Sequence, residues 1–256
     1  MSNILIIGKK SWMAGMLAAY IPESVLSEKR MEDIQEESLV GYDVLINCAA
    51  MTNIDSCEAN KGKALFTNAI DPTILAGKCH RAGMKYVFSS SACIFESAHE
   101  SDTKYEDSIP NPGCFYSRSK VLAEELILET CPDALIIRPR LPISEVPHPR
   151  NTLDKLLKYD KINTNQESVT VVEDMLPVLK QLIETNASGV YHLVNAGTIS
   201  PAEIATALGH TFEEVTKESQ DARLKEEGRA KRVTTIVGSK KIPLLRDIRE
   251  RMPEIV

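Results

Sequence analysis

Short segments that are apolar at every position, spaced by longer helical segments, restrict the fold of this sequence more than any other feature. Residues 4–7, 44–46, 86–88 and 134–137 form such segments, each of the length of one strand. A strand buried on both faces has this continuous apolar pattern, because helices cover both sides of a parallel sheet. The sequence therefore predicts an α/β fold of the Rossmann type, with a doubly wound parallel sheet.

Helical patterns occupy the segments between these strands. The first helix is expected over residues 12–19, and residues 25–26 give a weak second strand. Residues 61–82 predict one long helix in spite of Pro72. A further helix over residues 116–129 precedes the last of the apolar strands. This alternation is typical of consecutive βαβ units.

The composition fits a globular protein and excludes several classes of function. The chain has 256 residues, 43% of them hydrophobic, and a formal net charge of −6 without a basic stripe, so we expect neither nucleic acid nor membrane as a partner. No apolar segment reaches the roughly 18 residues of a membrane span, and the first residues lack the basic head of a signal peptide. The five histidines show no ligand spacing, so we expect no metal. The cysteines form no Cys-x-x-Cys pair and indicate reduced thiols in a cytoplasmic protein: Cys48, Cys57, Cys79, Cys93, Cys114 and Cys131.

A glycine turn follows the first expected strand. Gly8 precedes the first helix, where a dinucleotide fold places its phosphate-binding turn. The usual pattern of three glycines is reduced here to Gly8-x-x-Ser11-x-x-Ala14. The position of the turn predicts contacts to a dinucleotide, and a plain turn without a ligand is the alternative. The residues expected to make these contacts are Gly8, Lys9, Lys10, Ser11, Trp12 and Met13.

Charged residues at the end of the second strand bear on the choice of nicotinamide cofactor. A fold that prefers NAD usually has an acidic residue there, which binds the ribose 2′-hydroxyl. Here Lys29 and Arg30 follow Glu28, and Lys9 and Lys10 stand in the glycine turn. This excess of cations suits a 2′-phosphate and favours NADPH, whereas Glu28 keeps NADH open. A solvated run of surface charge is the alternative.

The strongest chemical signal is Tyr116-Ser-Arg-Ser-Lys120. Spacing of four residues on a helix puts the phenol and the ammonium on one face, one turn apart. A tyrosine has a free pKa of about 10, and a nearby cation favours its phenolate. Ser91, after the fourth strand, adds a hydroxyl that can hold a carbonyl oxygen. These three residue types are what the reduction of a ketone requires.

Several motifs in the first 140 residues together resemble the extended short-chain dehydrogenase/reductases that modify nucleotide sugars. They are residues 47–50 after the third strand, Asn68, residues 88–95 and residues 105–120. The resemblance implies an oxidoreductase with a Rossmann sheet. It adds Cys48, Ala49, Ala50 and Asn68, with Tyr116 and Lys120, to the cofactor contacts. It also assigns Thr52 and Ser91 to the substrate.

A second set of motifs spans nearly the whole chain and is similar to a narrower family. The motifs are residues 8–15, 93–96, 140–144, 149–151 with Lys155, and 194–200. They resemble the nucleotide-rhamnose synthase/epimerase-reductases of plants and large viruses, within the dTDP-4-dehydrorhamnose reductase-like group. Those enzymes convert a nucleotide-linked 4-keto-6-deoxyglucose to L-rhamnose, with epimerisation at C3 and C5 and NADPH-dependent reduction at C4. The chain departs from the pattern at Ser11, Ala14, residues 96–106 and its tail after residue 210.

The resemblance also assigns residues to the epimerisation at C3 and C5. A ketone at C4 acidifies the protons on both neighbouring carbons, so one base and one acid on opposite faces can serve C3 and C5. The resemblance implies Cys93 and Lys155 as this pair and Arg140, Arg150 and Asn151 as substrate contacts. A small buried hydrophobe at Cys93 and a solvated helix lysine at Lys155 are the structural alternatives.

We expect residues 1–140 to form an NAD(P)-binding Rossmann domain. Residues 141–256 should form mainly a small substrate-binding cap, with some segments returning to the Rossmann sheet. The pattern there is weaker: short helices near 150–159, 173–185 and 201–208, a strand at 190–194, and a charged, poorly periodic segment at 211–235.

Two alternatives to the bifunctional enzyme stay open. One is a 4-keto reductase alone, and the other is a nucleotide-binding regulatory subunit on the same fold. The sequence leaves open whether UDP, dTDP or GDP carries the sugar, and whether the chain is a monomer or a homodimer.

Overall fold

The computed structural model describes residues 3–256, and the chain in it divides into two units. Unit 1 contains the chain up to Ser91 together with two later segments, Phe115–Arg138 and Leu179–Tyr191. Unit 2 contains the remaining three segments, Ala92–Cys114, Pro139–Val178 and His192–Val256. Unit 2 thus contains most of the residues expected to form the cap, from 141 onward, and also the earlier segment Ala92–Cys114. Residues 179–191 return to unit 1.

A six-stranded sheet organises unit 1. Its order is β2 (Val25–Leu26), β1 (Ile4–Ile7), β3 (Val44–Asn47), β4 (Lys85–Ser89), β5 (Leu135–Arg138) and β9 (Gly189–His192). The neighbouring pairs from β2 to β5 are parallel, and every residue of β1, β3 and β5 is buried. The strand order changes direction between β1 and β3, and ligands of such sheets bind at this kind of switch point. The expected doubly wound sheet is confirmed.

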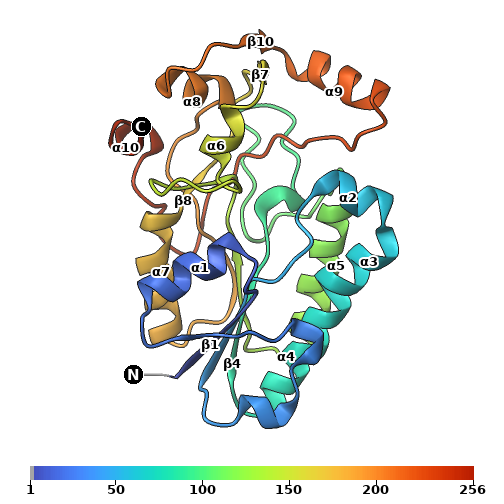
Figure 1. Cartoon of the computed structure of the whole chain (residues 1–256), viewed down its shortest axis with the longest axis vertical. Coiled ribbons are helices and arrows are strands. Elements are labelled where there is room, and N and C mark those ends of the chain that lie inside the picture. The colour runs from blue at the N-terminus through green and yellow to red at the C-terminus, as the bar shows by residue number, and fades with distance from the viewer. Residues whose placement is uncertain (1–2) are drawn as a thin grey trace. The chain divides into compact units, whose positions relative to one another are not determined.

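Helices cover both faces of this sheet, with α1 (Trp12–Tyr20) on one side and α4 (Asp71–Arg81) and α5 (Phe115–Thr130) on the other (Figure 1). Alternate strand residues point toward α4 and α5, because strand side chains alternate between faces. Large buried side chains such as Tyr86 and Phe88 therefore pack against both helices. Their apolar burial stabilises unit 1.

The helical stretch expected over residues 61–82 contains a wider turn. It begins as α3 (Lys61–Leu65), passes through a π-helical turn, η3 (Phe66–Ile70), and continues as α4. Pro72 has no N–H to donate, and its ring would clash with the carbonyl of Asn68 four residues earlier in a regular α-helix. The wider turn before the proline lets the helix continue, and π-turns are frequent at functional sites.

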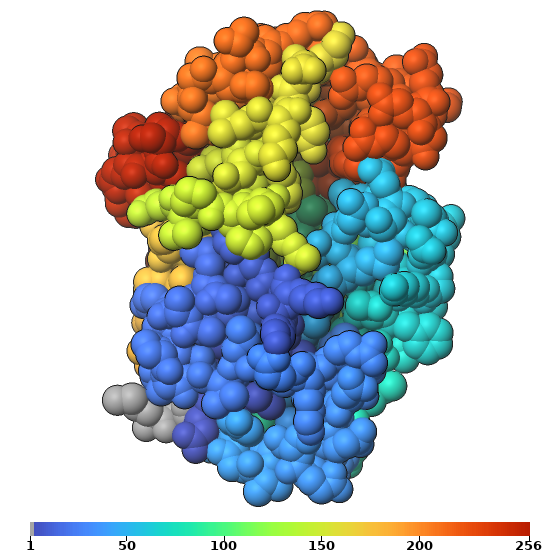
Figure 2. All heavy atoms as spheres, in the orientation of Figure 1, coloured from blue at the N-terminus to red at the C-terminus, as the bar shows by residue number. Residues whose placement is uncertain are grey.

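Unit 2 is built from short elements around its own core. Strand β7 (Lys161–Asn163) pairs in parallel with β10 (Glu213–Val215), and β6 (Pro142–Ile143) with β8 (Thr170–Val171). The β7 segment lies beside the β10 segment on the surface in Figure 2. Its core joins α6 (Thr152–Leu156), α8 (Pro201–Ala207) and α10 (Ile248–Ile255). The buried residues that these helices contribute are Leu153, Leu156, Ile204, Ala205, Ile248 and Met252.

The helices of unit 2 follow the sequence pattern where caps or apolar periodicity mark them. Helix α8 (Pro201–Ala207) begins with a capping box between Ser200 and Glu203. Helix α7 (Val172–Glu184) corresponds to the helix expected near residues 173–185. It begins in unit 2 and ends in unit 1. Helix α6 (Thr152–Leu156) is shorter than expected, and α10 (Ile248–Ile255) ends the chain.

The charged segment at 211–235 contains two elements that the pattern did not predict. These are β10 and α9 (Lys217–Glu226). Leu224 is the one buried residue of α9, so this helix lacks an apolar stripe. None of the helices within residues 3–256 combines the length and apolarity needed to cross a membrane.

Two glycines test the packing at the start of the fold. Gly8 has φ +118°, and a Cβ there would lie 3.0 Å from the amide nitrogen of Ala49. We expect Gly8→Ala to lower the free energy of unfolding by about 1–3 kcal/mol, because both the backbone angle and the contact are strained. Gly15 lies inside α1 with open space around it, so Gly15→Ala should raise stability by about 0.5–1 kcal/mol. Urea denaturation measures both, and equal effects of the two variants would contradict this account.

Candidate active site

The turn after β1 brings backbone groups of two strands together in unit 1. Ser11 donates its N–H to the Gly8 carbonyl at 2.6 Å and caps α1 with its hydroxyl. Ala14 is fully buried where the usual motif has its third glycine, so a small side chain still permits close packing. The N-terminus of α1, which begins at Trp12 and Met13, is thus held at the switch point of the sheet. A helix N-terminus in this position can bind a phosphate.

Two buried asparagines fix the loop after β3. The Asn47 side chain accepts the Ala49 N–H at 3.0 Å and donates to the Tyr86 hydroxyl at 2.9 Å. Asn68, in the π-turn, accepts the N–H of Met51 at 2.8 Å and donates to its carbonyl at 3.0 Å. These bonds hold the segment of Cys48, Ala49 and Ala50 against the first turn, while Thr52 beyond it is exposed.

Asn68 also connects this loop to the helix that carries the tyrosine. Its amide donates to the Ser119 hydroxyl at 3.1 Å, and Ser119 donates to the carbonyl of Tyr116 at 2.7 Å. Tyr116 lies in the first turn of α5 and is buried, as is Ser91 after β4. The structure therefore gives Asn68 a role in placing the first turn of α5.

Lys120 lies one turn after Tyr116 and is almost completely buried. Its ammonium donates to the Ser89 carbonyl at 2.9 Å and stands 4.4 Å from the centre of the Phe88 ring. Burial lowers the pKa of Lys120 to about 8, and the negative charge of Glu124 opposes this shift. This lysine can therefore change its charge near neutral pH.

A buried ion pair lies under the same helix. The Arg138 Nε contacts both carboxylate oxygens of Glu124 at 3.0 Å, and Ser90 donates to that carboxylate. Both partners of the pair are buried. Sequence reasoning missed Glu124 and Arg138, because their pairing joins α5 to β5 and leaves no local pattern.

The cations expected to bind a 2′-phosphate lie on the surface, and three of them have partners. Lys9 forms an ion pair with Glu28, and Lys29 donates to the Ser38 hydroxyl at 2.8 Å. Arg30 contacts Asp33 at 3.1 Å and also Glu32, while Lys10 is exposed. Glu28, the acidic residue that leaves NADH possible as the cofactor, is thus paired with Lys9 of the glycine turn.

Cys93 lies in the short helical turn η4 (Ala92–Ile94) of unit 2 and is half-buried. The Arg140 Nη1 donates to its sulfur at 2.8 Å. The same guanidinium donates to Glu167 through Nε at 3.1 Å and Nη2 at 2.5 Å, and to the Val233 carbonyl at 2.7 Å. Burial by itself would lower the pKa of Arg140, but Cys93 and Glu167 raise it overall.

The other candidates of unit 2 lie on α6. Asn151 caps this helix, accepting the Leu153 N–H at 3.2 Å and donating to the Ser144 carbonyl at 2.8 Å. Lys155 is solvent-exposed on the next turn, and Arg150 is exposed before the cap. Partial desolvation lowers the pKa of Lys155, and the positive charges of Arg150 and Lys158 lower it further. The cap orients the turn that presents this lysine.

Comparison with known proteins places the chain in a family. The family model for the RmlD substrate binding domain matches residues 23–235, which is most of the chain. The chain belongs to this family.

Relatives of this RmlD family member extend over most of its length. A bifunctional dTDP-4-dehydrorhamnose 3,5-epimerase/dTDP-4-dehydrorhamnose reductase of Arabidopsis thaliana is 30% identical over 220 residues, covering 79% of this chain and 73% of the relative. The structure of the L780 UDP-rhamnose synthase of Acanthamoeba polyphaga mimivirus matches with a TM-score of 0.87 at 23% identity. The match covers 99% of this chain and 98% of that structure. The structure of a Bacillus anthracis dTDP-4-dehydrorhamnose reductase in complex with NADP matches with a TM-score of 0.81 at 20% identity, over 99% of this chain and 98% of that structure. The two structures share the fold of this chain.

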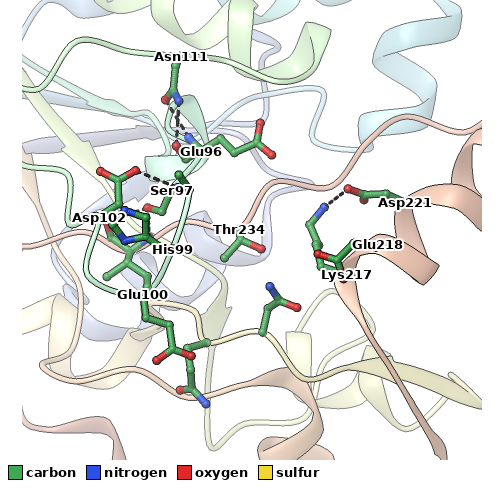
Figure 3. A pocket seen from close by; sticks show the side chains of 14 residues that line it. Glu96, Ser97, His99, Glu100, Asp102, Asn111, Lys217, Glu218, Asp221 and Thr234 are labelled. Carbon is green, nitrogen blue, oxygen red and sulfur yellow. Dashed lines mark hydrogen bonds and ion pairs between the residues drawn. The ribbon is translucent and has the colours of Figure 1, made fainter.

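The RmlD-family chain also has a polar cavity of about 520 Å³ within unit 2 (Figure 3). On one side Asn111 and Glu96 exchange two hydrogen bonds, at 2.8 and 2.9 Å. On the other side Lys217 pairs with Asp221 of α9. Carboxylates and amides dominate the lining, so the cavity suits a ligand rich in hydroxyl groups better than a phosphate.

One group of possible metal ligands was not expected from the sequence. His80, Cys131 and Asp133 in unit 1 place one ligand atom each within 4.8 Å of one another. Burial raises the pKa of Cys131 to about 12, so its thiol stays protonated. The Lys85 ammonium donates to the Asp133 carbonyl at 2.6 Å, which already supplies a cation there. We therefore assign this group no metal.

The buried lysine gives the family member a pH-dependent stability. With a folded pKa of about 8 and an ordinary value of 10.5, Lys120 binds fewer protons folded than unfolded between these pH values. The contribution of Lys120 to the free energy of unfolding therefore rises as the pH increases from about 8 to 10.5. The free energy of unfolding of the wild type, relative to Lys120→Met, should increase by about 1–2 kcal/mol between about pH 7.5 and 9.5. Urea titrations measure it, and parallel pH curves for the two proteins would refute the shift.

Proposed function

We propose that this chain is an NADPH-dependent enzyme that converts a nucleotide-linked 4-keto-6-deoxyhexose to a nucleotide-linked L-rhamnose-type sugar, by 3,5-epimerisation and 4-keto reduction. The observation that carries the proposal is that the chain holds two sets of chemical groups. Unit 1 has the buried Tyr116 and Lys120, and unit 2 has the Cys93 sulfur on a buried guanidinium. The named activities of the Arabidopsis relative, an epimerase and a reductase, support the pairing of these functions.

Unit 1 fits a dinucleotide. Without a side chain at Gly8, the turn leaves room against Cys48 and Ala49 at the N-terminus of α1, where a Cβ would collide. NADP in the Bacillus anthracis neighbour, which has the same fold, supports the choice of cofactor. We assign the pyrophosphate to this turn and the 2′-phosphate to Lys29 and Arg30, with Lys9 and Lys10. Bound NADPH would supply a hydride to C4 of the sugar.

The residues of unit 1 would supply the proton that the reduction requires. Tyr116 donates its phenolic proton to the C4 oxygen as that oxygen gains charge, and Ser91 holds the same oxygen by a hydrogen bond. Lys120, charged below its pKa of about 8, favours the phenolate that remains. Asn68 orients this machinery through Ser119.

The residues of unit 2 would move protons at carbon. Cys93 takes the proton next to the ketone, and Lys155, with its lowered pKa, returns a proton from the opposite face. The carbanion is stabilised as an enolate by the polarised C4 ketone, so one arrangement serves both C3 and C5. We assign Arg150 and Asn151, with Thr52 of unit 1, to contacts with the nucleotide sugar.

The epimerisation and the reduction can be separated by mutation. In D₂O without NADPH, wild type should incorporate deuterium at C3 and C5 of the 4-keto sugar. Cys93→Ser should lose this exchange by about 100-fold or more, because a hydroxyl hardly ionises near neutral pH. It should still reduce a substrate that is already epimerised. Tyr116→Phe should lose at least about 100-fold in reduction, with a smaller loss of exchange. NMR of the sugar and NADPH absorbance measure both.

Three results would revise the proposal in distinct ways. Absence of deuterium incorporation by the wild type would leave a 4-keto reductase. Absence of NADPH oxidation with any nucleotide-linked 4-keto-6-deoxy sugar would leave a binding protein. Reduction by Tyr116→Phe at the wild-type rate would remove the tyrosine from its assigned role. UDP, dTDP and GDP sugars are compared in the same assay.

Removal of charged side chains tests the cofactor preference. Wild type should bind NADPH more tightly than NADH, by a ratio that falls with added salt because surface charges are screened. Replacing Lys29 and Arg30 together by alanine should reduce the ratio. Glu28→Gln should increase it, because this change frees Lys9 from its ion pair. Cofactor fluorescence titrations give the ratio, and equal binding of the two cofactors by the wild type would contradict the assignment.

A further inference from the structure

The C-terminal helix α10 is connected to a distant surface segment of unit 2 by one buried arginine. Arg251 is 5% exposed, and its guanidinium donates to three carboxylates. Nε contacts Asp174 of α7 at 3.1 Å, Nη1 contacts Glu254 of α10 at 2.9 Å, and Nη2 pairs with Glu145. The contact with Glu145 joins residues that are 106 positions apart in the chain. Hydrogen bonds between ionised groups are the strong ones, so this contact fixes α10 to the segment around Glu145.

The first turn of α7 holds the same segment. Glu173 accepts the Ser144 hydroxyl at 2.5 Å and the Glu145 N–H at 3.2 Å. The neighbouring Asp174 is fixed in turn, because the side-chain amide of Asn195 donates to it at 2.9 Å. Two adjacent carboxylates of α7 therefore support the segment, one directly and the other through the guanidinium on α10.

Residues 144–151, here called the 144–151 segment, connect this support to side chains that we assign to the substrate. The Asn151 amide donates to two backbone carbonyls of the segment, at 2.8 and 3.3 Å. Asn151 also caps α6, the helix on which Lys155 lies. Arg150 is exposed, and its N–H donates to the ring of His148 at 3.0 Å. The positions of Arg150 and Lys155 therefore depend on how the segment is held.

The 144–151 segment contains turns and bends but neither helix nor strand. Residues 145–147 are exposed, as are residues 149 and 150. An exposed loop that becomes ordered only when a ligand binds loses conformational entropy in that step, which weakens binding. Contacts that order the loop beforehand remove this cost. The ion pair with α10 is such a contact.

We propose that Arg251 is a positioning residue for the nucleotide sugar: through Glu145, helix α10 holds the 144–151 segment in the conformation that binds the substrate. This inference rests on the proposed function, which assigns Arg150 and Asn151 to the nucleotide sugar. Helix α10 lies in the tail of the chain that departs from the family pattern. The support acts on binding of the sugar, since the residues that we assign to the reduction belong to unit 1.

The kinetics of the reduction test the inference. NADPH oxidation is followed with a nucleotide-linked 4-keto sugar that is already epimerised at C3 and C5, so that the rate does not include the epimerisation. Glu145→Gln removes the charge on the segment and leaves Arg251 paired with the carboxylates of α7 and α10. It should raise KM for the sugar by roughly 10-fold, with kcat changed by less than about 2-fold and NADPH binding unchanged. Arg251→Met should raise KM at least as much.

Arg246→Met is the matched control. Arg246 is exposed, and the hydrogen bonds described for its side chain within residues 3–256 go to Glu254 of α10, at 3.0 and 2.7 Å. It thus shares a partner with Arg251, and its variant should keep the wild-type KM. The double variant Arg251→Met/Glu145→Gln should raise KM no more than Arg251→Met alone, because both changes break the same contact.

Hydrogen exchange measures the support without any substrate. Mass spectrometry follows backbone amides in peptides that contain the 144–151 segment. In Glu145→Gln and Arg251→Met these amides should exchange faster than in wild type by about 10-fold or more, because the segment opens more easily. Peptides from the sheet of unit 1 should exchange as in wild type. Arg246→Met should exchange like wild type in both regions.

Three outcomes would overturn the inference while the proposed function stands. One is an unchanged KM in Glu145→Gln and Arg251→Met, with a cooperative thermal transition that shows folded proteins. Another is a fall in kcat at constant KM, which would mean that the ion pair affects only the amount of folded enzyme. The third is unchanged hydrogen exchange of the segment. Failure of the proposed function has a different sign: the wild type oxidises no NADPH with any nucleotide-linked 4-keto-6-deoxy sugar, and Arg251 is then a structural contact alone.

Discussion

The close approach of two parallel strands at the switch point of the sheet is the constraint on which unit 1 depends. A Cβ at Gly8 would lie 3.0 Å from the backbone at Cys48 and Ala49, so only glycine allows the turn after β1 to pack there. That turn sets where α1 begins. Asn47 and Asn68 then fix the neighbouring loop through buried hydrogen bonds. The dinucleotide site that we propose at this edge thus depends on strand order and on close backbone contact.

Buried ion pairs connect the proposed chemistry to the scaffold in both units. Burying an ion costs several kcal/mol unless it is paired, so these groups persist only as networks. In unit 1, Glu124 pairs with Arg138 and also opposes the fall in the pKa of Lys120. In unit 2, the charge network instead contacts a sulfur through Arg140. Each network holds a charge beside a group whose proton affinity matters for the proposed reaction.

Much of the fold could be predicted from the sequence, because its strands are continuously apolar and buried on both faces. The sequence also placed a tyrosine and a lysine one turn apart on α5. It did not predict α9, since that helix buries only Leu224 and is held by contacts outside its own pattern. It did not reveal the π-turn before Pro72 either, although the proline was visible. A helix pattern alone does not show how the chain accommodates a missing N–H.

The sequence by itself determined the local relations in this protein: strand positions, the glycine turn before the first helix, and the spacing of Tyr116 and Lys120. These depend on periodicity and on neighbours within one turn. The tertiary structure decided that Lys120 is desolvated and that Arg140 contacts Cys93, residues 47 positions apart. Burial and contacts between distant segments have no repeating signal in the sequence. They arise only when packing excludes water and brings those segments together.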